Sequence, residues 1–167
     1  MKDISYYNSK SGVISLERLK KVPGYPGEND FSKGPIAVIE CDEDIPCNPC
    51  EDICKYSAIK VGTPITNLPV LDTDKCIGCL KCITVCPGLC IFGVHKDYTD
   101  KTSLIYIPYE LAPLPEKGIE VDVLDRKGEK ICSGFIRKVI KPGNNKTAII
   151  GMEIPKKFYN TARHFKF

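Results

Sequence analysis

Cysteines at short, regular spacing are the residues of this chain whose types and positions best suit chemistry. The chain has ten cysteines among 167 residues, and nine of them lie between Cys41 and Cys90. The segment Cys76–Pro87 reads C-x2-C-x2-C-x3-C-P. Gaps of two residues let a tightly curled loop point successive thiolates at one cubic iron–sulfur cluster, and Gly78 permits the tight backbone. The spacing therefore predicts a 4Fe–4S cluster, and the last cysteine of the run lies too far round the loop to complete the same cube.

A second run of cysteines lies upstream and repeats the pattern. Segment 47–59 has the same cysteine spacing as segment 79–91, and the two copies end alike, with Ala58-Ile59 in one and Cys90-Ile91 in the other. An internal repeat of this kind predicts a pseudo-two-fold core with two clusters. Because the last cysteine of each run reaches the other cluster, we expect crossed ligation. The first cluster is expected to take Cys41, Cys47, Cys50 and Cys86, and the second Cys76, Cys79, Cys82 and Cys54.

The first ligand position of the upstream run is irregular. Regular spacing would place it at Asp44, whereas Cys41 lies three residues earlier. Thiolate is a softer ligand than carboxylate and suits iron–sulfur clusters better, so we expect Cys41 to complete the first cluster. Ligation by Asp44, and a 3Fe–4S cluster that lacks one iron, are the alternatives at this position.

The other possible metal ligands have simpler interpretations. Cys90 aligns with Ala58 in the repeat, so we expect a small thiol that packs beside the cluster without ligating it. Cys132 lies in a strand-like run and has no spaced partner, and His95 and His164 are isolated from any carboxylate or nucleophile pattern. Zinc is the alternative metal, but zinc ribbons present two pairs of cysteines rather than two runs of three or four.

The elements that must position the cysteines divide the chain into three zones. Residues 1–35 form an N-terminal extension with a short helix expected at 15–21, and residues 36–100 form the cluster domain, which begins with a strand at 36–39. Residues 101–167 are expected to form a small all-β barrel or sandwich with a short C-terminal helix over 155–167. Its strands are expected at 104–109, 119–124, 131–140 and 147–154, with a turn at 142–145 and a proline-rich connection from core to tail at 108–115.

Residues 36–95 resemble the bacterial ferredoxins that carry two 4Fe–4S clusters. The resemblance is closest at Cys76–Pro87 and good at Cys47–Cys54, although Lys55 stands where the family has proline. It implies an α+β fold in which a ferredoxin-like dicluster core with a pseudo-two-fold repeat precedes the small β-domain. It also implies that the chain is an electron-transfer protein.

A wider resemblance covers almost the whole chain. Segments 34–41, 45–51 and 86–89 look like the small ferredoxin-type subunits of multisubunit FAD-dependent amino-acid dehydrogenases, of the proline or hydroxyproline type, from anaerobic bacteria and archaea. The resemblance implies a hetero-oligomeric complex in which a FAD-containing subunit oxidises the amine. This chain would carry the electrons through two 4Fe–4S clusters to an external acceptor, as an oxidoreductase subunit that is not catalytic alone. The sequence shows no nucleophile–base motif, nucleotide-binding glycine loop or flavin motif.

Composition and charge argue against several other classes of protein. The formal net charge of +3 is too small to indicate a general nucleic-acid binder. Charges at Lys2, Asp3 and Lys10 leave no apolar signal-peptide core, and no uncharged apolar run has the length of a membrane helix. We therefore expect a cytoplasmic protein, in a reducing compartment where ten cysteines indicate metal rather than disulfides.

The tail distinguishes the competing functions. Segment 40–90 has eight acidic residues and four lysines, whereas segment 118–167 has eleven basic and five acidic residues. A free, diffusible ferredoxin needs only the core, so a long basic tail favours a subunit that docks onto a larger partner. Because all eight expected ligands precede the tail, we expect cluster assembly not to need it. A free ferredoxin with an appended domain and a non-redox protein with structural clusters are the alternatives.

Overall fold

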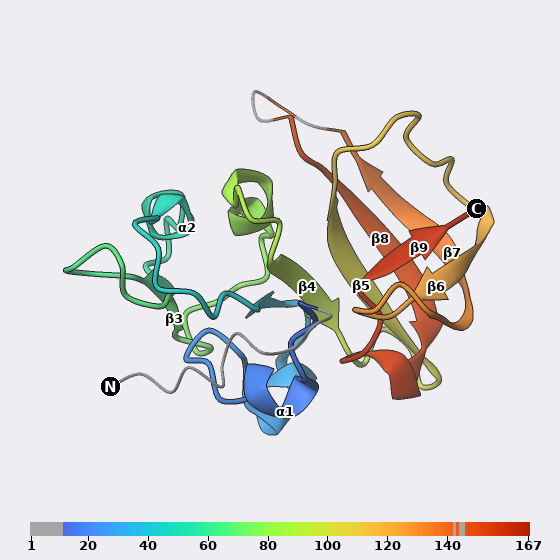
Figure 1. The fold of residues 1–167 in the computed structure, drawn as a ribbon. Coiled ribbons are helices and arrows are strands. Elements are labelled where there is room, and N and C mark those ends of the chain that lie inside the picture. Colours follow the sequence, from blue (N-terminus) through green and yellow to red (C-terminus); the bar gives the residue numbers. More distant parts are fainter. Residues whose placement is uncertain (1–11, 142, 144–145) are drawn as a thin grey trace.

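The computed structural model describes residues 12–141, 143 and 146–167 (Figure 1). Two predictions lie wholly or partly outside these residues: the charged start of the chain at 1–11 and the turn at 142–145. The described chain is mostly strand, with a few short helices. None of the helices in these residues is both long and apolar enough to cross a membrane.

Seven strands form one antiparallel sheet in the order β1-β4-β5-β8-β7-β6-β9. A separate two-stranded sheet pairs β2 with β3. The strands are β1 (Ile36–Ile39), β2 (Ile59–Lys60), β3 (Val70–Leu71), β4 (Ile91–His95), β5 (Thr102–Tyr109), β6 (Glu120–Leu124), β7 (Lys130–Ile140), β8 (Ala148–Pro155) and β9 (His164–Lys166). The helices are α1 (Leu16–Leu19), α2 (Pro49–Asp52) and the 3₁₀ helices η2 (Glu28–Lys33), η3 (Lys81–Val85) and η4 (Lys156–Phe158).

The large sheet curls but does not close, so the prediction of a barrel or sandwich is only partly right. Strands β5 and β9 are separated by three strands in the sheet order. Nevertheless, the rings of Tyr109 on β5 and Phe165 on β9 stack with their centroids 5.4 Å apart. Twist accumulated over several strands brings these distant strands together, and β9 lies in front of the curled sheet in Figure 1. The enclosed core includes Val123, Ile136 and Met152, which are fully buried.

The predicted strands of the tail all exist, whereas their connections differ from those expected. The proline-rich stretch at 108–115 does not join core to tail, because β5 includes Pro108 and the rest of the stretch connects β5 to β6. The expected short C-terminal helix is only partly right. The 3₁₀ helix η4 begins just after Pro155 but lasts three residues, and β9 follows it, because the end of the chain pairs with β6.

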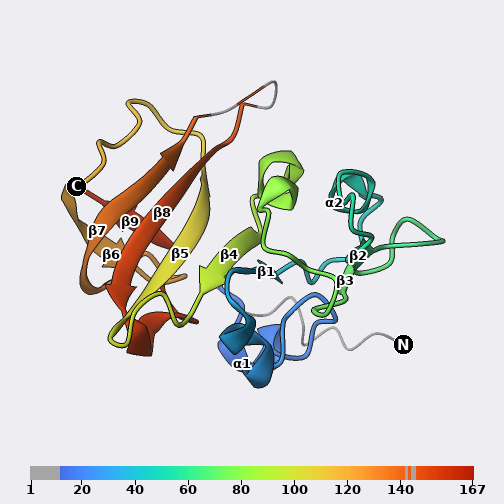
Figure 2. The ribbon, with the colours of Figure 1, turned by 180° about the vertical axis from the view of Figure 1, so that it is seen from behind.

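One sheet extends across the predicted boundary at residue 100. Strands β1 and β4 belong to the expected cluster domain, and β4 pairs directly with β5, with Val94 opposite Ile105. Figure 2 shows β4 leading from the cysteine-bearing part of the molecule to the curled sheet. The division into a cluster domain and a tail domain stays a prediction, but backbone hydrogen bonds of the same sheet link its two sides.

A buried ion-pair network links the same two sides. Glu40, just after β1, accepts hydrogen bonds from Arg163 Nε at 2.8 Å and from Arg126 Nε at 2.9 Å. Glu40 is 9% exposed and Arg163 5% exposed. Burial raises the pKa of Glu40, but the charges and hydrogen bonds of the two guanidinium groups outweigh it, and the net pKa is lowered. The carboxylate beside Cys41 is therefore held by residues of the tail.

Candidate functional site

The two cysteine runs occupy equivalent structural positions. Cys50 lies on α2 and Cys82 on η3, and these two short helices pack against each other. Each helix is followed by a strand that begins at the same repeat position, β2 at Ile59 and β4 at Ile91. The internal repeat of the sequence is therefore also a repeat of a helical turn and a strand.

Local backbone geometry explains why the downstream loop has its sequence. Gly78 has a φ of 66°, in the left-handed region, and a Cβ at this position would collide with the Pro35 carbonyl oxygen. Only glycine satisfies both conditions, which confirms the prediction that this position needs a tight backbone. The loop is thus held against the segment just before β1, and Cys76 and Cys79 flank this contact.

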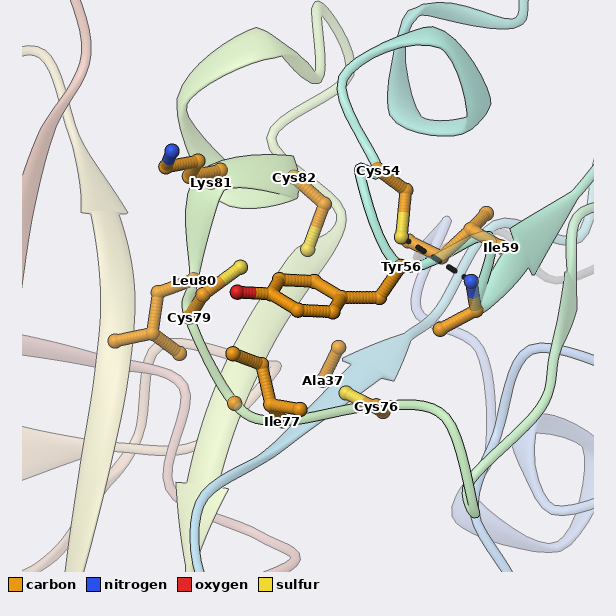
Figure 3. A pocket seen from close by; sticks show the side chains of 12 residues that line it. Ala37, Cys54, Tyr56, Ile59, Cys76, Ile77, Cys79, Leu80, Lys81 and Cys82 are labelled. Atoms are coloured by element: carbon orange, nitrogen blue, oxygen red, sulfur yellow. Dashed lines mark hydrogen bonds between the residues drawn. The ribbon is translucent and has the colours of Figure 1, made fainter.

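One cavity is lined by the four cysteines that the sequence assigns to the second cluster, and we call it the second cavity (Figure 3). It contains about 360 Å³ of space, part of which is open to solvent. Ala37, Ala58 and Tyr56 also line it, and in the view of Figure 3 the cysteines lie around the Tyr56 ring. Its cysteines are Cys54, Cys76, Cys79 and Cys82.

A separate cavity, which we call the first cavity, is lined by the four cysteines assigned to the first cluster and by a fifth cysteine, Cys90. It contains about 390 Å³, also partly open to solvent. Asp44, the rival of Cys41, is exposed and is not among its lining residues. Its cysteines are Cys41, Cys47, Cys50, Cys86 and Cys90. The two sets of cysteines expected from the spacing therefore line two separate cavities, and their crossed ligation stays a prediction.

The fifth thiol of the first cavity contacts one of the expected ligands. The Sγ atoms of Cys86 and Cys90 lie 3.5 Å apart. Hydrogen bonding by the Cys90 thiol lowers the pKa of Cys86 to about 6 and that of nearby Cys41 to about 7. The same interactions raise the pKa of Cys90. The sequence placed Cys90 beside the cluster, but the repeat alone could not reveal this contact.

Burial acts in the opposite direction on the cysteines of the two short helices. It raises the pKa of Cys82 to about 12 and that of Cys50 to about 11. These thiols hold their protons at neutral pH, so binding of a metal centre must release them. Cys79, in contrast, is exposed and marks the solvent side of the second cavity.

The remaining candidate ligands lie apart from both cavities. Cys132 is on β7, His95 on β4 and His164 on β9, and none of them lines either cavity. The backbone N–H of Phe165 donates a hydrogen bond to His164 Nδ1. In the described part of the chain, no group of three or more His, Cys, Asp or Glu side chains is arranged to hold a single metal ion.

The downstream run matches a known protein family. Residues 69–92 match the family described as "4Fe-4S binding domain", and the run Cys76–Cys86 lies inside this match. The chain thus contains a 4Fe–4S binding segment. The match covers one of the two cysteine runs, so the second cluster belongs to the proposal below.

Two curated proteins are similar to parts of the chain. A selenate reductase subunit of Mesobacillus selenatarsenatis is 37% identical over 73 residues, which is 43% of this chain and 24% of that protein. The pyruvate synthase subunit PorD of Methanothermobacter thermautotrophicus is 52% identical over 40 residues, 23% of this chain and 49% of that protein. The chain therefore matches less than half the length of either relative. No solved structure matches it.

Proposed function

We propose that the chain is an electron-transfer subunit with two 4Fe–4S clusters, which carries electrons from a FAD-containing dehydrogenase subunit to an external acceptor. One observation carries the proposal: two separate cavities are each lined by the four cysteines that crossed ligation requires. A structural metal site needs only one set of four cysteines, whereas a route for electrons benefits from two. The match of residues 69–92 to a 4Fe–4S binding family supports the identity of the cofactor.

The cysteines suit such clusters for two reasons: their thiolates are soft ligands, and one of their sulfurs accepts a backbone hydrogen bond. Thiolates are the ligands that iron–sulfur clusters prefer, and when bound the clusters supply one-electron transfer. The amide of Ala58 donates a hydrogen bond to Cys54 Sγ at 3.3 Å (Figure 3). Bonds of this kind stabilise negative charge on a ligating sulfur. Cys50 and Cys82 are buried on the two short helices that carry them, and these helices pack together.

The rim of the second cavity suits contact with a partner protein. Tyr56 is 48% exposed and Ile77 56% exposed, and both line this cavity beside exposed Cys79. Lys81 also lines the cavity and is exposed, as is Lys55, the neighbour of Tyr56 in the chain. Exposed apolar side chains next to a redox centre favour a short distance to a docked partner.

The choice of partner rests on resemblance. The segments at 34–41 and 45–51 look like those of ferredoxin-type subunits in FAD-dependent amino-acid dehydrogenases, and two relatives are named as subunits of larger enzymes. In this proposal the flavin subunit performs the oxidation, and this chain has no catalytic residue. We place the complex in the cytoplasm, where reduced thiols remain available for cluster assembly.

Anaerobic purification of the full chain tests the proposal. Two clusters require about eight iron and eight acid-labile sulfide per chain. Zinc in place of iron, or about four iron per chain, would contradict the assignment of two clusters. Purification with its natural partners then distinguishes the functions: a subunit retains a flavoprotein through gel filtration, whereas a free ferredoxin elutes alone.

A further inference from the structure

The two cavities are built alike but differ by one thiol. The position four residues after the last cysteine of each run lines a cavity, and this residue is Ala58 in the second cavity and Cys90 in the first. In the second cavity the backbone amide of Ala58 donates a hydrogen bond to Cys54 Sγ at 3.3 Å. The first cavity has, at the equivalent position, a side-chain sulfur that lies 3.5 Å from Cys86 Sγ.

The backbone around Cys90 fixes the position of this thiol. Its carbonyl accepts a hydrogen bond of 2.9 Å from the amide of Glu40, whose carboxylate is itself held by Arg126 and Arg163. The Cys90 Sγ lies 3.5 Å from Cys86 Sγ, and Cys41 lines the same cavity. The thiol is thus held against the sulfur of Cys86.

Ligand chemistry decides which sulfur donates. Between two thiols either atom could be the donor. A cysteine that ligates iron has lost its proton, so Cys86 and Cys41 can only accept once a cluster is bound. Cys90 is the one thiol of this group that keeps a proton and can share it with Cys86.

We propose that Cys90 donates a hydrogen bond to the ligating sulfur of Cys86 and thereby raises the reduction potential of the first cluster. The inference rests on the proposed function, because it requires a cluster in the first cavity. A donor to a ligand sulfur stabilises the added negative charge of the reduced cluster, and hydrogen bonds to sulfur are among the factors that set such potentials. Ala58 has no side-chain donor, so the second cluster lacks an equivalent bond. The first cluster should therefore have the higher reduction potential and hold the electron.

Redox titration of the anaerobic holoprotein, followed by electron paramagnetic resonance, tests this role. In Cys90→Ala one midpoint potential should fall while the iron and sulfide contents stay at the wild-type level. The reciprocal variant Ala58→Cys should raise the other midpoint. Cys90→Ser retains a donor and should keep the midpoint closer to the wild-type value than Cys90→Ala does. Cys132→Ala, which removes a thiol from β7 that lines neither cavity, should leave both midpoints unchanged.

Distinct results would overturn this inference and the proposed function. Unchanged midpoints in Cys90→Ala, with both clusters intact, would reject the hydrogen-bonding role and leave the proposed function standing. Loss of about half the iron from this variant would also reject it, because Cys90 would then be a ligand. Absence of two clusters from the wild-type protein would instead reject the proposed function itself.

Discussion

At the scale of single residues, most of the cysteines that line each cavity could be grouped in advance because the cysteines of each run are close in sequence. Spacing alone positions Cys47, Cys50 and Cys54 on one helical turn and its flanks. Cys41 does not follow the regular spacing, yet it lines the first cavity. The loop between Cys41 and Cys47 returns the chain to the cavity, and no local rule of spacing could have fixed that path.

The first prediction concerns Cys41 and Asp44. Cys41→Ser should convert or remove the first cluster, lowering the iron content toward about four per chain, while the second cluster stays reducible. Asp44→Asn should leave both clusters intact, because Asp44 does not line the cavity. Iron analysis and electron paramagnetic resonance of the reduced proteins give the answer. The opposite pattern, with Asp44→Asn altering a cluster and Cys41→Ser silent, would make Asp44 the ligand.

The second prediction concerns Glu40, a residue that the sequence did not single out. Its partners Arg126 and Arg163 lie 86 and 123 residues away, so no local pattern could have paired them. Glu40→Gln leaves two guanidinium groups without their buried carboxylate and should lower the free energy of unfolding by about 3–5 kcal/mol. Denaturant unfolding under anaerobic conditions measures the loss. Glu116→Gln, in the exposed β5–β6 loop, is the control and should change stability little.

At the scale of elements, the long strands were predictable and their partners were not. Alternation of apolar residues and turn signals marked the tail strands β5, β6, β7 and β8 to within a residue or two, but not β9. Pairing of β4 with β5, and of β9 with β6, depends on contacts that no local pattern contains. For the same reason, the expectation of a C-terminal helix failed where a strand partner was available.

The third prediction concerns the contact between β4 and the downstream cysteine loop. Gly93 on β4 faces Leu80 and Tyr106 so closely that a Cβ would collide with Leu80 Cδ2. Gly93→Val should therefore lower stability by about 1–3 kcal/mol and perturb the second cavity, since Leu80 follows Cys79. Thermal unfolding and the spectrum of the second cluster report the two effects. Gly143→Ala, where a Cβ meets nothing within 4 Å, should leave both unchanged.

At the scale of the whole molecule, the cysteine-bearing part and the tail are joined more closely than the sequence indicated. They share the large sheet through β4 and β5, and the tail supplies both partners of Glu40. A long basic tail can still contribute to docking, but it also holds Glu40, the residue that precedes Cys41. Removing it therefore does more than remove a docking surface.

The fourth prediction concerns a chain that ends at residue 100. The sequence suggested that such a chain keeps both clusters, whereas the structure gives reason to expect that it does not keep the first. Without β5 and the two arginines, β4 loses a strand partner and Glu40 loses its counter-charges. Iron content after anaerobic purification should fall below that of the full chain. A shortened chain with about eight iron would instead support a tail that serves docking alone.

The Glu40–Arg163 bond has a consequence for how the protein is made. A ribosome adds about 5–20 residues per second, so Arg163 is synthesised about 6–25 seconds after Glu40. Before the end of that interval every expected cluster ligand and Arg126 have been translated, but the carboxylate next to Cys41 still lacks its second partner, Arg163. Machinery that delivers iron and sulfide to the nascent chain would meet a Glu40 that is not yet fully held in place. Stable loading of the first cavity is therefore expected to follow synthesis of Arg163, whereas the second cavity has all its cysteines by residue 82.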